Sequence, residues 1–227
     1  MSEKFELSLG EYLKTIQRGE VVLVEYTSDE PIHLILHMIL RYLKRENIPV
    51  VILDVLDHLH MFRNHLKFAG VPTDLIDEAR VIKIGGIISD RNVLGKIDLT
   101  EDPAVMRTKY HKTLEQLANE HEYFVRVGLG MDKLLRMAKS PWDLEVLLGT
   151  VSRPMIGHEK SWGIIFVNTR VISEECVQEL REIASRVFDI KLEKGEITFT
   201  VVKSVNFDEY GAAISIKAQE LQDYLGK

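Results

Sequence analysis

Residues 21–54 read VVLVEYTSDEPIHLILHMILRYLKRENIPVVILD, and the expected fold follows from this stretch. The runs at 21–26 and 50–54 are dense in β-branched residues, as is typical of buried strands. Between them, apolar residues recur at helical spacing from position 32 to position 43, after a proline in the first turn. A strand, a helix and a second strand predict a βαβ unit, whose right-handed crossover makes the strands parallel.

The same alternation continues on both sides of this unit. An amphipathic helix with apolar residues between Leu9 and Ile16 precedes it. Further strands are predicted at 80–84, 123–129 and 162–168, and further helices at 57–68, 103–120 and 174–187. This order favours an α/β fold with a mainly parallel central sheet flanked by helices. Because no Pro/Gly-rich linker interrupts residues 1–227, we expect a single domain with its core at 8–217.

The last forty residues change character. Residues 190–204 predict a hairpin that turns at Lys194 and Gly195, and residues 212–216 predict one more strand, followed by a helical tail at 218–227. A hairpin makes its two strands antiparallel. We therefore expect antiparallel strands at one end of the parallel sheet, and we expect 197–202 and 212–216 to leave an edge open to an added strand.

Composition narrows the classes of function. The chain has 35 acidic and 29 basic residues, a net charge of −6 that disfavours nucleic acid as a partner. A single cysteine, Cys176, excludes an internal disulfide and favours the cytoplasm. The first twenty residues carry frequent charges, and no apolar run reaches membrane-spanning length, so neither a signal peptide nor a membrane helix is expected. The chain has few amide side chains, five Gln and six Asn, and 28% charged residues. This balance favours a thermophilic source.

The loop after the first strand is where an α/β sheet is expected to bind ligands. It reads Thr27, Ser28, Asp29, Glu30, Pro31, Ile32 and His33. A phosphate-binding loop needs glycines and a lysine, and this loop has neither. A carboxylate about 5 Å from a phosphate charge costs roughly 3 kcal/mol at an effective dielectric of about 20, so triphosphate binding here is disfavoured. An ordinary helix cap of Ser, Asp and Glu is the alternative interpretation of these residues.

The order of these parts resembles the RecA/KaiC-like ATPase core, and more narrowly a small family of unknown function from hyperthermophilic archaea. The resemblance implies a RecA-like three-layer domain. Its Walker A segment corresponds to residues 27–33, where the Gly-Lys-Ser/Thr is absent. Its Walker B strand corresponds to residues 123–129, where Gly128 and the residues after it replace the terminal aspartate. Its catalytic acid corresponds to Asp54, with Asp57 nearby.

Histidines supply a second set of candidates. His33 and His37 are four residues apart on one predicted helix, a spacing that can place two imidazoles on one metal ion. Asp54, Asp57, His58, His60 and His65 cluster at and after the end of the second strand. A metal-dependent hydrolase is one interpretation. The other is that His37 is partly buried and that His58, His60 and His65 lie on the surface of the next helix.

We therefore expect a catalytically inactive RecA/KaiC-like protein that binds a protein or peptide partner and itself, without a cofactor. The alternative is an enzyme in which Asp54, Asp57 and His58 act on a nucleotide or another phosphorylated ligand. In that case residues 27–30 and His33 would line the site for the nucleotide, which the sequence leaves open as a ligand.

Overall fold

The computed structural model describes residues 2–227, apart from the side chain of Val151. One sheet contains nine strands in the order β4-β3-β2-β5-β6-β1-β7-β8-β9. Neighbours from β4 to β7 are parallel, whereas β7–β8 and β8–β9 are antiparallel. The strands are β1 (Val21–Tyr26), β2 (Val50–Val55), β3 (Arg80–Ile84), β4 (Val93–Ile97), β5 (Phe124–Leu129), β6 (Ser161–Asn168), β7 (Arg186–Glu193), β8 (Glu196–Lys203) and β9 (Ala213–Lys217).

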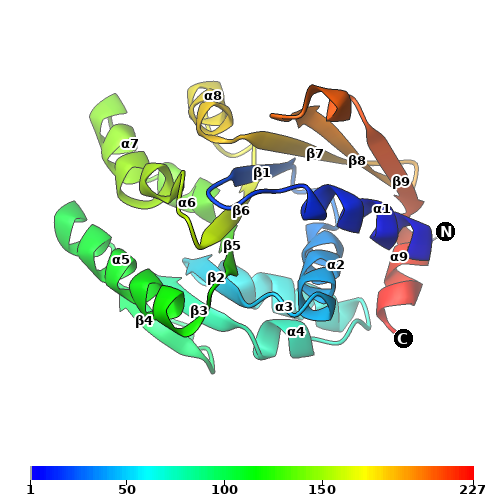
Figure 1. Ribbon diagram of the computed structural model, residues 1–227, viewed down its shortest axis with the longest axis horizontal. Helices are drawn as coiled ribbons and strands as arrows, with labels where there is room; N and C mark the ends of the chain where they lie inside the picture. The colour runs from blue at the N-terminus through cyan, green and yellow to red at the C-terminus, as the bar shows by residue number, and fades with distance from the viewer. Residues whose placement is uncertain (1) are drawn as a thin grey trace.

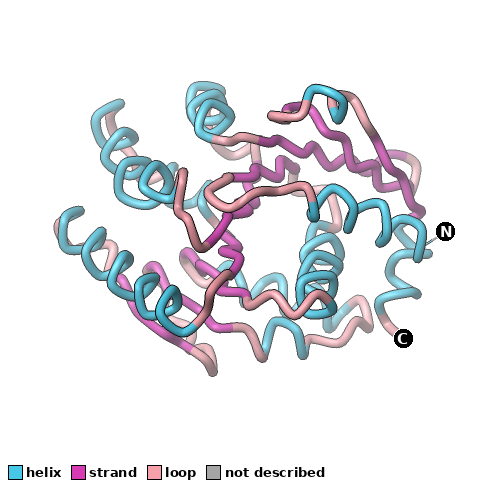
Figure 2. Tube along the Cα trace, in the orientation of Figure 1, coloured by secondary structure: helices cyan, strands magenta, loops and turns pink. Residues whose placement is uncertain are grey.

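Helices cover both faces of this sheet, which confirms the three-layer α/β prediction (Figures 1 and 2). The α-helices are α1 (Ser2–Lys14), α2 (Ile32–Arg45), α3 (His58–Phe68), α4 (Asp74–Asp77), α5 (Pro103–Glu120), α6 (Met131–Leu135), α7 (Pro141–Leu147), α8 (Glu174–Ile183) and α9 (Ala218–Leu225). Three short segments complete the chain: a π-helix at Leu148–Ser152 and 3-10 turns at Arg153–Met155 and Phe207–Glu209.

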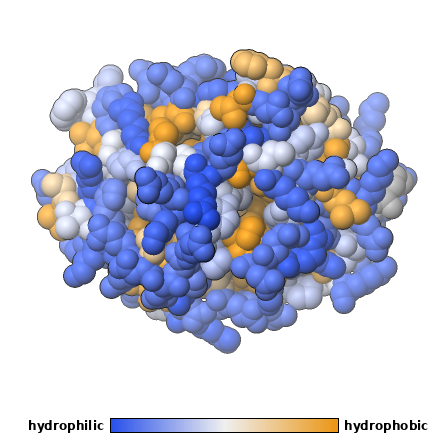
Figure 3. All heavy atoms as spheres, in the orientation of Figure 1, coloured by the Kyte–Doolittle hydropathy of each residue, from blue (hydrophilic) through white to orange (hydrophobic). Residues whose placement is uncertain are grey.

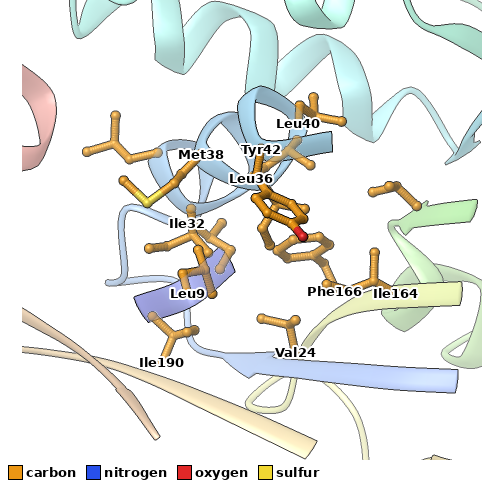
Figure 4. Close-up of a cluster of buried hydrophobic side chains, with 14 of the residues drawn as sticks. Leu9, Val24, Ile32, Leu36, Met38, Leu40, Tyr42, Ile164, Phe166 and Ile190 are labelled. Carbon is orange, nitrogen blue, oxygen red and sulfur yellow. The ribbon is translucent and has the colours of Figure 1, made fainter. Parts of the chain in front are cut away.

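Two hydrophobic cores result, one on each face. The first packs α1, α2, α3 and α9 against the sheet, and the second packs α5, α6, α7 and α8. On β1, Val22 and Val24 enter the first core whereas Leu23 enters the second, because successive side chains of a strand point to opposite faces. Figure 4 shows part of the first core, in which Leu36 of α2 lies above Val24 of β1 and Phe166 of β6. A strand buried on both faces explains why residues 21–26 are almost continuously apolar.

The sequence predicted most elements but not all. Strand β4 was missed, and the helix predicted at 174–187 ends at Ile183, because β7 already begins at Arg186. Gly128 lies inside β5, and it is Gly130 that makes the turn, with φ +79°. Of the two segments expected to expose an edge, β8 has a partner on each side and only β9 ends the sheet.

Hydrophilic side chains cover most of the face seen in Figure 3, with hydrophobic residues scattered between them. Within residues 2–227, no helix combines the length and apolarity that crossing a membrane requires.

Candidate functional site

The loop after β1 is closed by its own side chains. The Thr27 N–H donates to the carboxylate of Glu30, and the Ser28 hydroxyl accepts from the side-chain amide of Asn168 at 2.9 Å. Helix α2 has no side-chain cap, so the predicted ordinary cap is wrong: Glu30 turns back onto the loop instead of capping the helix. The Glu30 carboxylate thus occupies the Thr27 N–H, and a phosphate bound in this loop would need backbone N–H donors of that kind.

Asp54, at the end of β2, is completely buried, with 0% of its surface exposed. One carboxylate oxygen accepts from Leu59 N–H at 2.8 Å, and the other accepts from Lys83 Nζ at 2.6 Å. Both oxygens are therefore engaged within the protein. Asp54 ties the start of α3 and strand β3 to the end of β2.

Asp57 organises the loop between β3 and β4. Its carboxylate accepts from Lys83 Nζ at 2.6 Å and from the N–H groups of Ile87 and Ile88 at 2.7 and 3.1 Å. Burial alone raises the pKa of this carboxyl, but these hydrogen bonds together lower it below its ordinary value. A Cβ on Gly86 would lie 2.3 Å from an Asp57 oxygen, so the loop closes on this carboxylate only because position 86 is glycine.

Lys83 is the centre of a buried charge network. Besides Asp54 and Asp57, it contacts Asp90 at 3.1 Å, and Arg63 contacts Asp90 from the other side at 2.8 Å. Three carboxylates around one buried ammonium leave no cation free in this cluster. The network therefore links the ends of β2 and β3, and removing one partner would leave a buried charge without its counterpart.

A cleft of about 250 Å³ opens at the carboxyl ends of β1 and β6, next to α2, α3 and α6. Its polar lining includes Tyr26, His33, His58, His65, Asp132 and Asn168. Lys133 and Arg136 also line it. The structure thus places a cleft where α/β sheets generally bind ligands.

Left-handed backbone turns precede His58 and Asp132, the two buried side chains that line this cleft. Leu56 and Asp57 have φ of +52° and +62°, and His58 follows them directly. After β5, Gly130 has φ +79°, and a Cβ there would meet the Val55 carbonyl at 2.6 Å. Left-handed non-glycine residues cost on the order of 1 kcal/mol or more each and are most common at functional sites.

The histidines divide into two groups. His33, His58 and His65 line the cleft, and the rings of His33 and His65 lie 5.4 Å apart in an edge-on arrangement. Burial lowers the pKa of both His33 and His58 from 6.5 to about 4, assisted by His65 for His33 and by Lys133 for His58, so both rings are neutral at pH 7.

His58 departs from the expectation of a surface residue, since only 4% of it is exposed. His37 is also 4% exposed, on the core side of α2, and the side chain of His60 contacts Asn64 at 2.9 Å. Neither lines the cleft. In the described part of the chain, no three His, Cys, Asp or Glu side chains are placed to hold a metal ion together.

Asp132 is the site residue that the sequence did not predict. It is only 2% exposed, and burial raises the pKa of its carboxyl although Lys133 and Arg136 oppose the shift. Its place two residues beyond Gly130, after a buried strand, is the signal that could have drawn attention to it. The resemblance to RecA-like ATPases did not identify it, because Asp132 lies beyond the segment 123–129 that corresponds to the Walker B strand.

The free edge of β9 is the second candidate surface. At the end of this strand, Ala218 N–H donates to the Gly195 carbonyl at 2.9 Å. Because bonding residues alternate along an antiparallel pair, every second residue counted back from Ala218 bonds to β8. The residues between them direct their backbone N–H and C=O groups away from the sheet. These residues are Ala213, Ser215 and Lys217.

Comparisons with known proteins agree with this architecture. The family model for "Pyrococcus protein of unknown function, DUF257" matches residues 11–215, whereas no curated protein matches the chain. A solved structure of PH0250 from Pyrococcus horikoshii is similar with a TM-score of 0.78 and 25% identity, over 90% of this chain and 96% of that one.

Two further solved structures from Pyrococcus horikoshii share the fold. PH0321, crystallised in complex with an unknown peptide, has a TM-score of 0.64 and 14% identity, over 87% of this chain and 89% of that one. The KaiC-like protein PH0186 has a TM-score of 0.61 and 11% identity, over 87% of this chain and 85% of that one. The predicted RecA/KaiC-like fold is thereby confirmed.

Proposed function

We propose that this chain, which belongs to the DUF257 family of Pyrococcus proteins, is a catalytically inactive RecA-like module that binds a partner protein or peptide. The partner adds an extended segment to the free edge of β9. This encounter takes place in the reducing cytoplasm, where a protein with one free cysteine needs no disulfide.

The outward backbone of β9 carries the proposal. Ala213, Ser215 and Lys217 present unpaired N–H and C=O groups in the described chain, and their side chains are exposed. An extended peptide can pair with such groups whatever its own side chains are. The strand is short and carries one lysine, a residue that discourages uncontrolled pairing of edges. PH0321, which shares the fold at 14% identity, was crystallised with a peptide, and this supports a peptide as the partner class.

Lack of nucleotide chemistry is the other half of the proposal. Glu30 occupies the Thr27 N–H, and the loop contributes no glycine and no lysine. We do not propose the enzyme that uses Asp54, because both of its oxygens are engaged inside the protein. Calorimetric titration with Mg-ATP is expected to give no binding tighter than about 1 mM, or about −4 kcal/mol. Micromolar binding would contradict this half.

Selection of random heptapeptides displayed on phage tests the binding half. Ser215→Pro removes an outward N–H but no backbone bond to β8, although it also removes the hydroxyl that lies 2.9 Å from the Thr198 hydroxyl of β8. Ser215→Thr keeps both the N–H and a hydroxyl and serves as the matched control. Peptides selected on the wild-type protein are expected to bind the threonine variant equally and the proline variant at least tenfold more weakly. Selected peptides that bind all three proteins equally would place the binding surface elsewhere.

Self-association through the same edge is part of the proposal. Two β9 strands can pair antiparallel about a two-fold axis at Ser215, which sets Ala213 opposite Lys217 of the second copy and brings no like charges face to face. Light scattering is expected to give twice the 26.1 kDa of one chain, and a single-chain mass for Ser215→Pro. A wild-type protein that is monomeric up to millimolar concentration would contradict self-association but not peptide binding.

A further inference from the structure

Two side chains that line the cleft each leave one buried polar atom without a hydrogen-bond partner among the described residues. These atoms are Nδ1 of His58 and Oδ1 of Asp132. An unsatisfied buried polar atom costs about 1–3 kcal/mol. Both atoms are buried, so a ligand that supplies the missing partners has to displace the side chains that cover them, and it would recover part of that cost.

The contact between Tyr26 and His58 bears on which partner His58 Nδ1 lacks. The Tyr26 hydroxyl lies 3.5 Å from Nε2 of His58. Burial raises the pKa of Tyr26, so its hydroxyl stays protonated and is able either to donate to Nε2 or to accept from it. We propose the arrangement in which Tyr26 donates, which puts the ring hydrogen of His58 on Nδ1 and leaves Nδ1 in need of an acceptor. Asp132 Oδ1 lacks the opposite partner, a hydrogen-bond donor, because a carboxylate oxygen is an acceptor.

We propose that the cleft is a second binding site, independent of the β9 edge, and that it takes a primary carboxamide: the side chain of a glutamine or asparagine on a protein or peptide. The carboxamide oxygen accepts from His58 Nδ1–H, and its NH₂ group donates to Asp132 Oδ1. Ile32, Met61 and Phe62 also line the cleft and supply apolar contacts for the methylene groups.

Charge and size favour this ligand over its relatives. Two acids, Glu30 and Asp132, and two bases, Lys133 and Arg136, line the cleft together, so a carboxylate or an ammonium group meets repulsion as well as attraction and gains no clear net attraction. A neutral group with one acceptor and one donor avoids this repulsion. A cleft of about 250 Å³ is also smaller than the pockets of roughly 300–1,000 Å³ that hold whole small-molecule ligands, so one side chain is a better match than a nucleotide.

Three probes of similar shape test the proposal on the full chain at pH 7.5: propionamide, propionate and propylammonium. Binding is followed by the imidazole ¹⁵N and ¹H signals of His58. Propionamide is expected to shift these signals saturably, and the two charged probes to bind at least tenfold more weakly. Propionate or propylammonium binding as tightly as propionamide would overturn the proposal, and this ranking requires no variant.

Variants assign the contacts. Asp132→Ala removes the acceptor and is expected to weaken propionamide binding at least tenfold, whereas Asp132→Asn keeps an acceptor oxygen and is expected to stay within threefold of wild type. His60→Phe, on the same helix but outside the cleft, is the matched control and is expected to bind as wild type does. Binding unchanged in a folded Asp132→Ala protein would overturn the assignment. Because none of these changes touches β9, failure here is distinguishable from failure of strand addition.

Discussion

Single carboxylates inside this protein accept hydrogen bonds from donors that a bound anion would otherwise need. Glu30 occupies a loop N–H, Asp57 occupies the N–H groups of Ile87 and Ile88, and Asp54 faces Lys83. Each of these acids was noticed in the sequence as a candidate for chemistry. Their spacing identified where they lie along the chain but not what they contact, because Lys83 comes from a different strand.

Removing Asp54 tests its structural role. Asp54→Ala leaves the Leu59 N–H without its acceptor and takes one of three carboxylates from buried Lys83. We expect the free energy of unfolding to fall by on the order of 3 kcal/mol. Asp54→Asn, which retains an acceptor for Leu59, is expected to lose less. Urea unfolding at pH 7 measures both, and a loss below about 1 kcal/mol in the alanine variant would contradict the role.

Buried histidines predict how stability depends on pH. In the folded chain the pKa of His37 and of His58 is lowered from 6.5 to about 4, mainly by burial. The unfolded chain therefore binds more protons between these values, so the stability is present above pH 6.5 and is lost as the pH falls toward 4. Each histidine is expected to account for about 2 kcal/mol of the loss between pH 8 and pH 5.

Urea unfolding of His58→Phe measures this dependence. The variant is expected to lose about 2 kcal/mol less than wild type between pH 8 and pH 5. His60→Phe, which retains both buried histidines, is the control and is expected to follow the wild-type profile. Equal pH dependence in wild type and His58→Phe would contradict the assignment.

At the scale of elements, strand β9 shows what sequence patterns can and cannot identify. The run at 212–216 predicted one more strand, and the turn at Lys194 and Gly195 predicted the neighbouring antiparallel hairpin of β7 and β8. Which strand would end the sheet depends on order in space, and only the structure resolves it, with β8 inside and β9 outside. Strand β4 was missed for a similar reason: its residues VLGKI are half-exposed, so the apolar signal is weak.

Proline substitution separates the two sides of β9. Ser215→Pro removes an outward N–H and is expected to change the free energy of unfolding by less than about 1 kcal/mol. Ile214→Pro removes an N–H that bonds to β8 and is expected to cost about 3 kcal/mol or more. Thermal and urea unfolding compare the two. Equal losses would mean that the outward direction assigned to Ser215 is wrong.

At the scale of the whole molecule, the repeated strand and helix pattern and the buried runs predicted a mainly parallel three-layer fold. The cleft was predictable only in part. Its place follows from the carboxyl ends of the strands, and His33 and His58 were among the candidates. The turn at Gly130 brings three further residues into the cleft, namely Asp132, Lys133 and Arg136. The sequence shows the glycine but not the direction in which the chain turns there.

We expect residues 1–227 to unfold as one domain. Both cores share the same nine-stranded sheet, so neither can lose its packing without exposing the other. Calorimetry is expected to give one transition whose calorimetric and van't Hoff enthalpies agree. Two resolved transitions, or a calorimetric enthalpy well above the van't Hoff value, would contradict a single domain.

The Glu30 carboxylate on the Thr27 N–H has a consequence for how such a protein can be regulated. A ligand that binds and is then hydrolysed drives a directional cycle, whereas a side chain attached to the chain can be neither consumed nor released. Without an energy source of that kind, occupancy of β9 or of the cleft follows only the concentrations and affinities of the partners. Under the proposed function, the protein would work as a reversible adaptor at equilibrium, which a cell adjusts by changing the supply of partners.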